Sequence, residues 1–126
     1  FLLSSSLSGV VAQRLVRTLC TQCRRPYEPT AADAAAVGAP ADDFAVLFDA
    51  PGCSVCSDTG FRGRSGMFEL VLMDTKMRAL IHDDAPEAEL DAHARRSTPA
   101  LFADGQRLVR EGVTSLAELQ RVTRAT

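Results

Sequence analysis

The chain holds four cysteines, and they form two pairs of the same spacing, Cys20-x-x-Cys23 and Cys53-x-x-Cys56, with 29 residues between the pairs. Two intervening residues let both sulfur atoms of a pair face one ion from a tight turn. Tetrahedral Zn²⁺ takes four thiolates at about 2.3 Å. We therefore predict that these side chains form a structural zinc site, because four protein ligands leave no open position for catalysis.

The residues around both pairs favour a metal site. Gly52, Gly60 and Gly63 surround the second pair and allow the backbone to curl around an ion. Four thiolates outweigh the charge of one zinc ion, so nearby cations would stabilise the site. The arginines that lie beside the pairs in the sequence are Arg24, Arg25, Arg62 and Arg64.

Three other uses of the cysteines stay open. The thiols could form two disulfides, all four could be free and only happen to be regularly spaced, or one pair could be redox-active. Disulfides need an oxidising compartment, and nothing in the sequence indicates export. Structural zinc is the interpretation that we favour.

Length and charge limit the remaining function classes. A chain of 126 residues with 46% hydrophobic residues can form one small domain with a buried core. The net charge of −2 argues against a nucleic-acid-binding protein, which needs clustered basic charge. The apolar start Phe1-Leu2-Leu3, without a methionine, suggests a piece of a longer protein. No run of about 18 apolar residues exists, so we expect no membrane span.

Hydrophobic spacing predicts a mainly helical chain. Apolar residues recur every three or four positions over residues 6–19, which indicates an amphipathic helix. The Thr30-x-x-Asp33 pattern predicts a capped short helix that ends near Gly38. Residues 67–73 form the best strand candidate, with both faces buried in a sheet that is supplied mainly by sequence outside this chain.

The second half of the chain carries further helix start signals. Asp74 is expected to cap a helix with Met77, and the prolines at 86 and 99 start two more. Ser115-x-x-Glu118 is the signature of a capping box at the start of a final helix. We therefore expect a mainly α fold with a tetracysteine zinc lobe and one or two short strands. Its domains would be a core helix in residues 1–19, the zinc lobe in residues 20–64, and a strand followed by a helical bundle in residues 65–126.

Candidate catalytic residues are scarce. His82 and His93 stand alone on predicted helices, where a histidine is usually solvated. No phosphate-binding loop of the G-x-x-x-x-G-K-[ST] type occurs, so we expect no nucleotide site within this chain. Between Thr59 and Leu70, three glycines alternate with Arg62 and Arg64, which predicts a bent loop that projects positive charge. These arginines either balance the thiolates or contact a nucleotide or carboxylate on a neighbouring subunit.

Three blocks of sequence resemble the C-terminal part of the type II secretion ATPases, the general secretion pathway protein E family, and the related type IV pilus assembly ATPases. The blocks are residues 5–20, which lead into the first cysteine pair, residues 52–70 around the second pair, and residues 104–123. The middle block, with Gly52-Cys53-Ser54-Val55-Cys56 and Gly60-Phe61-Arg62-Gly63-Arg64-Ser65-Gly66, is the most specific. The resemblance covers essentially the whole chain.

The resemblance implies a fragment of a RecA-like α/β ATPase. Such ATPases are cytoplasmic, lie against the bacterial inner membrane, assemble as hexamers and drive pseudopilus assembly with the secretion platform. ATP and Mg²⁺ would be bound by a part that this chain lacks, so the segment alone should be inactive. By similarity, Cys20, Cys23, Cys53 and Cys56 would hold the metal, and Arg64, with Arg62 beside it, would contact a neighbouring subunit near the nucleotide. The alternatives are a pilus ATPase segment, or a zinc-stabilised docking module without a role in ATP turnover.

Overall fold

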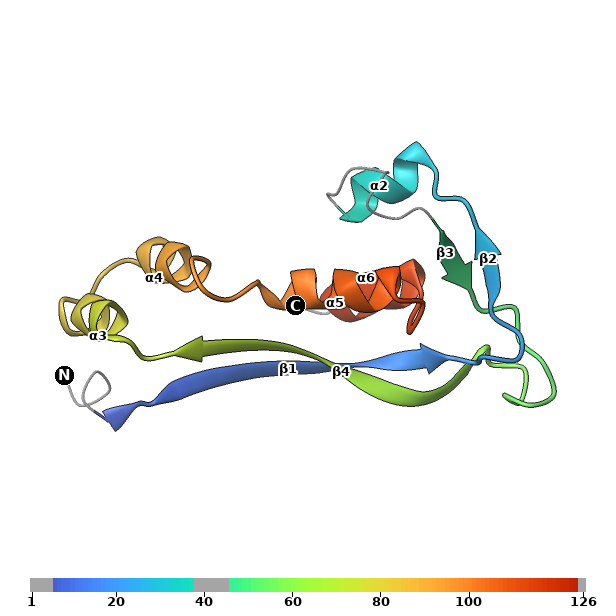
Figure 1. The fold of residues 1–126 in the computed structure, drawn as a ribbon, viewed down its shortest axis with the longest axis horizontal. Helices are drawn as coiled ribbons and strands as arrows, with labels where there is room; N and C mark the ends of the chain where they lie inside the picture. Colours follow the sequence, from blue (N-terminus) through green and yellow to red (C-terminus); the bar gives the residue numbers. More distant parts are fainter. Residues whose placement is uncertain (1–5, 38–45, 125–126) are drawn as a thin grey trace. The chain divides into compact units, whose positions relative to one another are not determined.

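The chain mixes strands and helices. The computed structural model describes residues 6–37 and 46–124, and Figure 1 labels their elements. The order is β1 (Gly9–Leu19), β2 (Arg25–Tyr27), α2 (Ala31–Val37), β3 (Leu47–Asp49), β4 (Phe61–Leu72), α3 (Thr75–His82), α4 (Glu87–Ala94), α5 (Leu101–Arg110) and α6 (Leu116–Arg124). Two of the strands are 11 and 12 residues long. The expectation of a mainly α fold with one or two short strands therefore underestimated the strand content.

The predicted helix over residues 6–19 is wrong, because this segment forms strand β1. β1 pairs with β4, and the N–H groups of Met73 and Cys20 donate to the carbonyls of Ser8 and Gly60, respectively, so the two strands run antiparallel. The segment holds three valines and one threonine, β-branched residues that fit strands well. Pairing with a strand about 50 residues away overrides the helical spacing of its apolar residues.

The predicted strand at residues 67–73 is confirmed, and it begins earlier than expected, at Phe61. Its partner β1 comes from this chain rather than from sequence outside it. Burial on both faces is also wrong: Met67 is fully buried, whereas Phe68 and Leu72 are 47% and 66% exposed. Side chains alternate between the two faces of a strand, so only one face of β4 contributes to the core.

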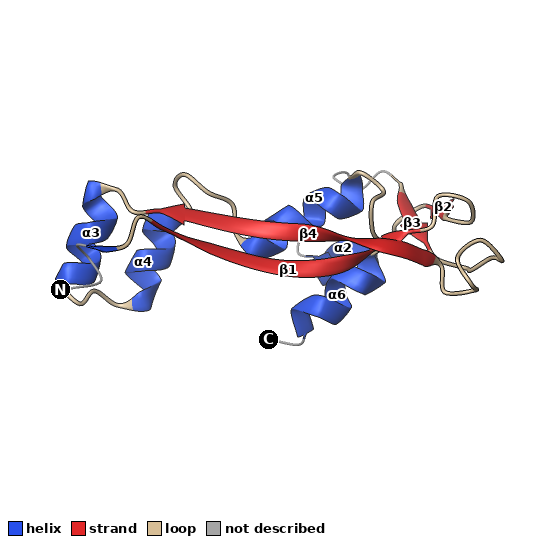
Figure 2. Ribbon diagram, turned by 90° about the horizontal axis from the view of Figure 1, so that it is seen from below, coloured by secondary structure: helices blue, strands red, loops and turns tan. Residues whose placement is uncertain are grey.

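The described residues fall into two compact units, and both long strands contribute to each. One unit combines the described residues before position 14 with Phe68–Asp104. In it, α3 and α4 are neighbours, as both views show (Figures 1 and 2), and Met77 and Ala94 are buried. The Asp74 carboxylate caps α3 by accepting from Met77 N–H at 2.7 Å, which confirms the predicted start of this helix.

The other unit combines Arg14–Met67 with the described residues from Gly105 onward. Its core is formed by buried apolar side chains from β1, β4, α5 and α6, namely Val16, Leu19, Met67, Leu108, Val109, Leu116, Leu119 and Val122. Gly105 allows close packing, since a Cβ there would lie 2.4 Å from Leu119 Cδ1. The helices predicted after the prolines at 86 and 99 and after Ser115 are all present as α4, α5 and α6.

The short helix predicted after Thr30 is present as α2. Its capping box is complete, because Asp33 N–H donates to Thr30 Oγ1 at 3.1 Å and Thr30 N–H donates to the Asp33 carboxylate at 2.8 Å. The predicted end near Gly38 lies outside the described residues. Within the described part of the chain, every helix is too short or too polar to cross a membrane.

Candidate metal centre

Two short strands bring the two cysteine pairs together. β2 begins at Arg25, just after Cys23, and pairs antiparallel with β3, which ends just before the second pair. In this register Arg25 faces Asp49 and Tyr27 faces Leu47. The hydrogen bond from Cys20 N–H to Gly60 O, 2.9 Å long, ties the same turns together from the side of the long strands.

The four sulfur atoms lie within 4.8 Å of one another. The sulfurs of Cys20 and Cys53 and those of Cys23 and Cys56 are 3.8 Å apart, and those of Cys53 and Cys56 are 3.7 Å apart. Four thiolates on the corners of a tetrahedron with Zn–S bonds of about 2.3 Å are separated by about 3.8 Å. A disulfide would need about 2.05 Å, and all four cysteines are free. The donor set therefore fits a tetrahedral metal ion.

Backbone N–H groups point at one of these sulfurs. Cys56 Sγ accepts from Cys53 N–H at 3.3 Å and from Gly60 N–H at 3.1 Å. Gly60 has φ +82°, and a Cβ there would lie 2.5 Å from the Cβ of Ala50. Only glycine satisfies both the left-handed backbone and this close approach, so the turn that directs an N–H at the sulfur depends on Gly60.

The four thiols are not equivalent. Burial raises the pKa of Cys56, but the N–H groups of Cys53 and Gly60 outweigh it and bring this pKa down to about 6. Burial, together with hydrogen bonds to the other three cysteines, raises the pKa of Cys23 to about 12. The group therefore combines one thiol that ionises readily with one that holds its proton, as expected when four such groups crowd together.

The arginines beside the first pair have partners away from the sulfurs. Arg24 stacks on Phe48, 4.5 Å from the ring centroid, and donates from Nη1 to Gly112 O at 2.7 Å. Arg25 forms an ion pair with Asp49 at 3.0 Å. These contacts tie the turn after the first cysteine pair to β3 and to the connection between α5 and α6.

Arg62 and Arg64 lie on β4, so the predicted bent loop is a strand here, with Gly63 between them at φ +76°. Both side chains are exposed, and neither forms an ion pair among the described residues. The structure does bring the four cysteines together, but it gives these two arginines no partner within that part of the chain.

His82 is exposed, as expected for a histidine on a helix surface, whereas His93 is not. His93 is 16% exposed at its side chain, and its Nε2 lies 2.9 Å from an oxygen of Asp74, the cap of α3. This contact holds α4 against the start of α3. The hydrogen bond to His93 is also one reason why the pKa of Asp74 is lowered, after the larger contribution of the Met77 N–H.

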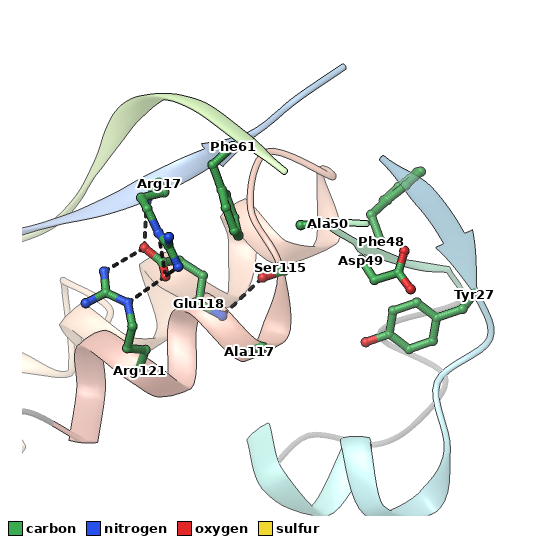
Figure 3. Close-up of a pocket in the computed structure, with 10 residues that line it drawn as sticks. All are labelled: Arg17, Tyr27, Phe48, Asp49, Ala50, Phe61, Ser115, Ala117, Glu118 and Arg121. Carbon is green, nitrogen blue, oxygen red and sulfur yellow. Dashed lines mark hydrogen bonds and ion pairs between the residues drawn. The ribbon is translucent and has the colours of Figure 1, made fainter. Parts of the chain in front are cut away.

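Sequence reasoning missed a buried carboxylate, Glu118. Its side chain is fully buried and accepts from Arg17 N–H at 2.8 Å, Arg17 Nη2 at 2.9 Å and Arg121 Nε at 2.8 Å (Figure 3). The predicted capping box is half formed, because Ser115 Oγ accepts from Glu118 N–H, whereas the carboxylate bonds to arginines. The only available signal was the pattern Glu118-x-x-Arg121, which is common on solvated helices.

Comparison with known proteins identifies the relatives of this chain. Residues 1–121 match the family model described as "Type II/IV secretion system protein". Type II secretion system protein E of Pseudomonas aeruginosa is 49% identical over 124 residues, which cover 98% of this chain and 25% of the relative. Type II secretion system ATPase E of Vibrio cholerae is 45% identical with the same coverage. A putative type II secretion system protein E of Escherichia coli is 37% identical over 136 aligned positions, covering 100% and 26% of the two chains.

The chain spans about a quarter of the length of these relatives. The resemblance inferred from the cysteine pairs and the flanking blocks is therefore confirmed over the whole chain. This chain belongs to the type II/IV secretion system protein family.

Proposed function

We propose that this chain is the zinc-binding, C-terminal segment of a hexameric, RecA-like ATPase that powers type II secretion by driving pseudopilus assembly. The observation that carries the proposal is the tetracysteine group, whose sulfur separations of 3.7 and 3.8 Å match those of a tetrahedral zinc site. The similarity to secretion proteins, one of them named as an ATPase, supports the parent's class.

Zinc in this site would be structural. Cys20, Cys23, Cys53 and Cys56 would fill all four positions, which leaves none for water or substrate. Structural zinc contributes on the order of 10 kcal/mol in small metal-folded peptides. The ion would therefore join two chain segments that β2 and β3 link through only three residue pairs.

ATP and Mg²⁺ would be bound by the rest of the parent protein. The chain has no phosphate-binding loop motif, so the isolated segment should not hydrolyse ATP. Arg64, with Arg62 beside it, is our candidate for a contact with a neighbouring subunit near its nucleotide. Both are exposed side chains on β4, and guanidinium groups suit phosphate and carboxylate partners.

The proposed location of the parent is the cytoplasm, against the inner face of the bacterial inner membrane. Its partners there would be other subunits of the homo-hexamer and the secretion platform proteins. The type IV pilus assembly ATPases are the alternative parent, because the blocks around the cysteine pairs resemble that family as well.

A second candidate function is a docking module in which the metal lobe binds a membrane partner and has no role in ATP turnover. The observation that favours it is a pocket between the metal lobe and α6, lined by Tyr27, Phe61 and Arg121 among others. In this alternative, loss of the metal would release the parent from the membrane without changing its ATPase rate.

Two measurements test the proposal. Elemental analysis of the purified chain should give one zinc per chain, and Cys53→Ser should abolish zinc binding.

In the full-length parent, Arg64→Ala should lower the hexamer-dependent ATPase rate at least about tenfold and leave membrane recruitment intact. Arg96→Ala, at an exposed position in the other unit, is the matched control. Retained ATPase with lost recruitment would favour the docking module, and a metal-free, equally ordered chain would refute the zinc site.

A further inference from the structure

A pocket of about 370 Å³ opens between the metal lobe and α6. Figure 3 shows its two walls: the Arg17, Glu118 and Arg121 cluster on one side, and Tyr27 with Asp49 on the other. All the residues that line it belong to one compact unit. The volume falls in the range of pockets that hold a small ligand or two side chains of a partner.

The arginines on the first wall are held in place by Glu118. The buried carboxylate accepts from Nε and Nη2 of each guanidinium, at distances between 2.8 and 3.2 Å. Nη1 of each arginine takes no part in these bonds, and the two side chains are 46% and 58% exposed. Asp49, on the other wall, is neutralised by its ion pair with Arg25 at 3.0 Å, so the two guanidinium groups and Glu118 leave a single net positive charge, oriented before any ligand arrives. A monoanion such as one carboxylate matches this charge.

Three aromatic side chains, Tyr27, Phe48 and Phe61, also line the pocket. The Phe61 ring lies under the Arg17 guanidinium, 4.2 Å from its Cζ atom to the ring centroid. The Tyr27 hydroxyl points toward the α6 side of the pocket (Figure 3). Burial and the nearby carboxylates of Asp33 and Asp49 raise the pKa of Tyr27, so this hydroxyl keeps its proton and can donate. An aromatic surface beside fixed guanidinium groups is typical of the anchoring pockets in protein interfaces.

We propose that this pocket binds a partner protein through a peptide segment in which an acidic side chain stands next to an aromatic or other large apolar one. The carboxylate would be held by Arg17 and Arg121, and the apolar side chain would lie against Phe61 and Tyr27. A nucleotide fits less well, because its phosphates carry several negative charges and the Arg17, Glu118 and Arg121 cluster offers one net positive charge. The inference goes beyond the proposed ATPase role and needs only the intact unit that carries the pocket.

The test uses the zinc-loaded chain and an N-acetylated, C-amidated aspartyl-phenylalanine dipeptide, followed by NMR. We expect saturable shifts of the amides of Arg17, Phe61 and Ala117, with a dissociation constant of about 1 mM, because one ion pair and one small apolar contact bind weakly. The asparaginyl-phenylalanine dipeptide, which lacks the charge, should bind roughly tenfold more weakly.

Two variants separate specific binding from general attraction. Arg121→Gln should weaken binding of the acidic dipeptide at least about fivefold, whereas Arg110→Gln, an exposed arginine that does not line the pocket, should leave it unchanged. Ala117→Phe fills the pocket from an exposed position of α6 and leaves the ion pairs untouched, so it should abolish binding while the chain stays folded.

Each opposite result would overturn the proposal. Equal binding of the two dipeptides would remove the role of the carboxylate, and equal effects of Arg121→Gln and Arg110→Gln would reduce the attraction to net charge. Full binding to the Ala117→Phe variant would place the ligand elsewhere. Tighter binding of AMP than of the acidic dipeptide at the same residues would make the pocket a nucleotide site. None of these outcomes depends on ATPase activity, so failure here leaves the proposed function untouched.

Discussion

Glu118 is the residue that links β1 to α6. Its carboxylate accepts from the backbone and side chain of Arg17 and from the side chain of Arg121. Nearby, Thr114 Oγ1 donates to Arg17 O and Leu19 N–H donates to Val113 O. One edge of β1 pairs with β4, so these bonds occupy its other edge and protect it from pairing with another chain.

Replacing this carboxylate should be costly. Glu118→Gln keeps the size of the side chain but removes its negative charge and replaces one of its two acceptor oxygens with an amide donor, which faces the arginine N–H groups. We expect a loss of about 2–4 kcal/mol in the free energy of unfolding, measured by chemical denaturation of the zinc-loaded chain. The control is Glu111→Gln. The Glu111 side chain is 53% exposed and pairs with Arg107, so this change should lower the free energy of unfolding by less than about 0.5 kcal/mol. Similar losses of stability in the two variants would mean that the burial of Glu118 does not strengthen its ion pairs.

Glu118 also makes the stability of the fold depend on pH. Burial alone would raise the pKa of Glu118, but the bonds from Arg121 and Arg17 outweigh it and lower this pKa from 4.5 to about 2. A carboxyl with a depressed pKa stabilises the fold above its unfolded value and loses that contribution as the pH falls. Stability should therefore decline between about pH 4.5 and pH 2, by on the order of 3 kcal/mol for this group. The Glu118→Gln variant should lack this component in urea titrations across that range.

At the scale of elements, the connection between α5 and α6 contacts the metal lobe. Gly112 has φ +76°, and a Cβ there would lie 2.8 Å from Arg24 Nη1 and 2.9 Å from the Phe48 ring. Its carbonyl accepts from the same arginine. The turn therefore needs glycine for its backbone conformation and for the approach of Arg24.

Gly112→Ala should destabilise the chain through both effects, and Gly63→Ala separates them. Gly63 has the same φ of +76°, but a Cβ there would meet nothing within 4 Å. We expect about 1 kcal/mol for Gly63→Ala from the backbone alone, and about 2–3 kcal/mol for Gly112→Ala. Equal midpoints in thermal or urea unfolding would show that Arg24 and Phe48 move aside freely.

The elements divide clearly into those that their own sequence predicts and those that it does not. Helices α3 to α6 carry local signals, such as the Asp74 cap and the prolines before α4 and α5, and these predictions are confirmed. β1 carries a helical spacing of apolar residues, and only its pairing with β4 makes it a strand. Glu118 has the sequence of a capping box, but the position of Arg17 in space decides where its carboxylate bonds. Long-range pairing is the information that local patterns lack.

At the scale of the whole molecule, the cysteines all belong to one unit, and the helices α3 and α4 belong to the other. That second unit has its own contacts, including the hydrogen bond between His93 and Asp74 and the ion pair of Arg95 with Glu69. Metal removal should therefore act unevenly along the chain.

We expect a chelator to remove hydrogen-exchange protection from β2, β3 and the cysteine turns, while the amides of α3 and α4 keep theirs. The physical reason is that structural zinc supplies folding free energy to the segments that it joins. Exchange mass spectrometry with and without EDTA measures this directly. Protection that stays unchanged around Cys20 and Cys53, or that vanishes equally in both units, would contradict the expected role of the ion.

The pairing of β2 with β3 brings Tyr27 and Leu47 side by side, so the chain between them is a loop whose two ends are held together. The free energy of closing such a loop rises only by about 0.6 kcal/mol for each doubling of its length. We therefore expect insertions between these two residues to cost little stability. A fluorescent protein or an epitope inserted there would label the protein while its cysteine turns stay in register.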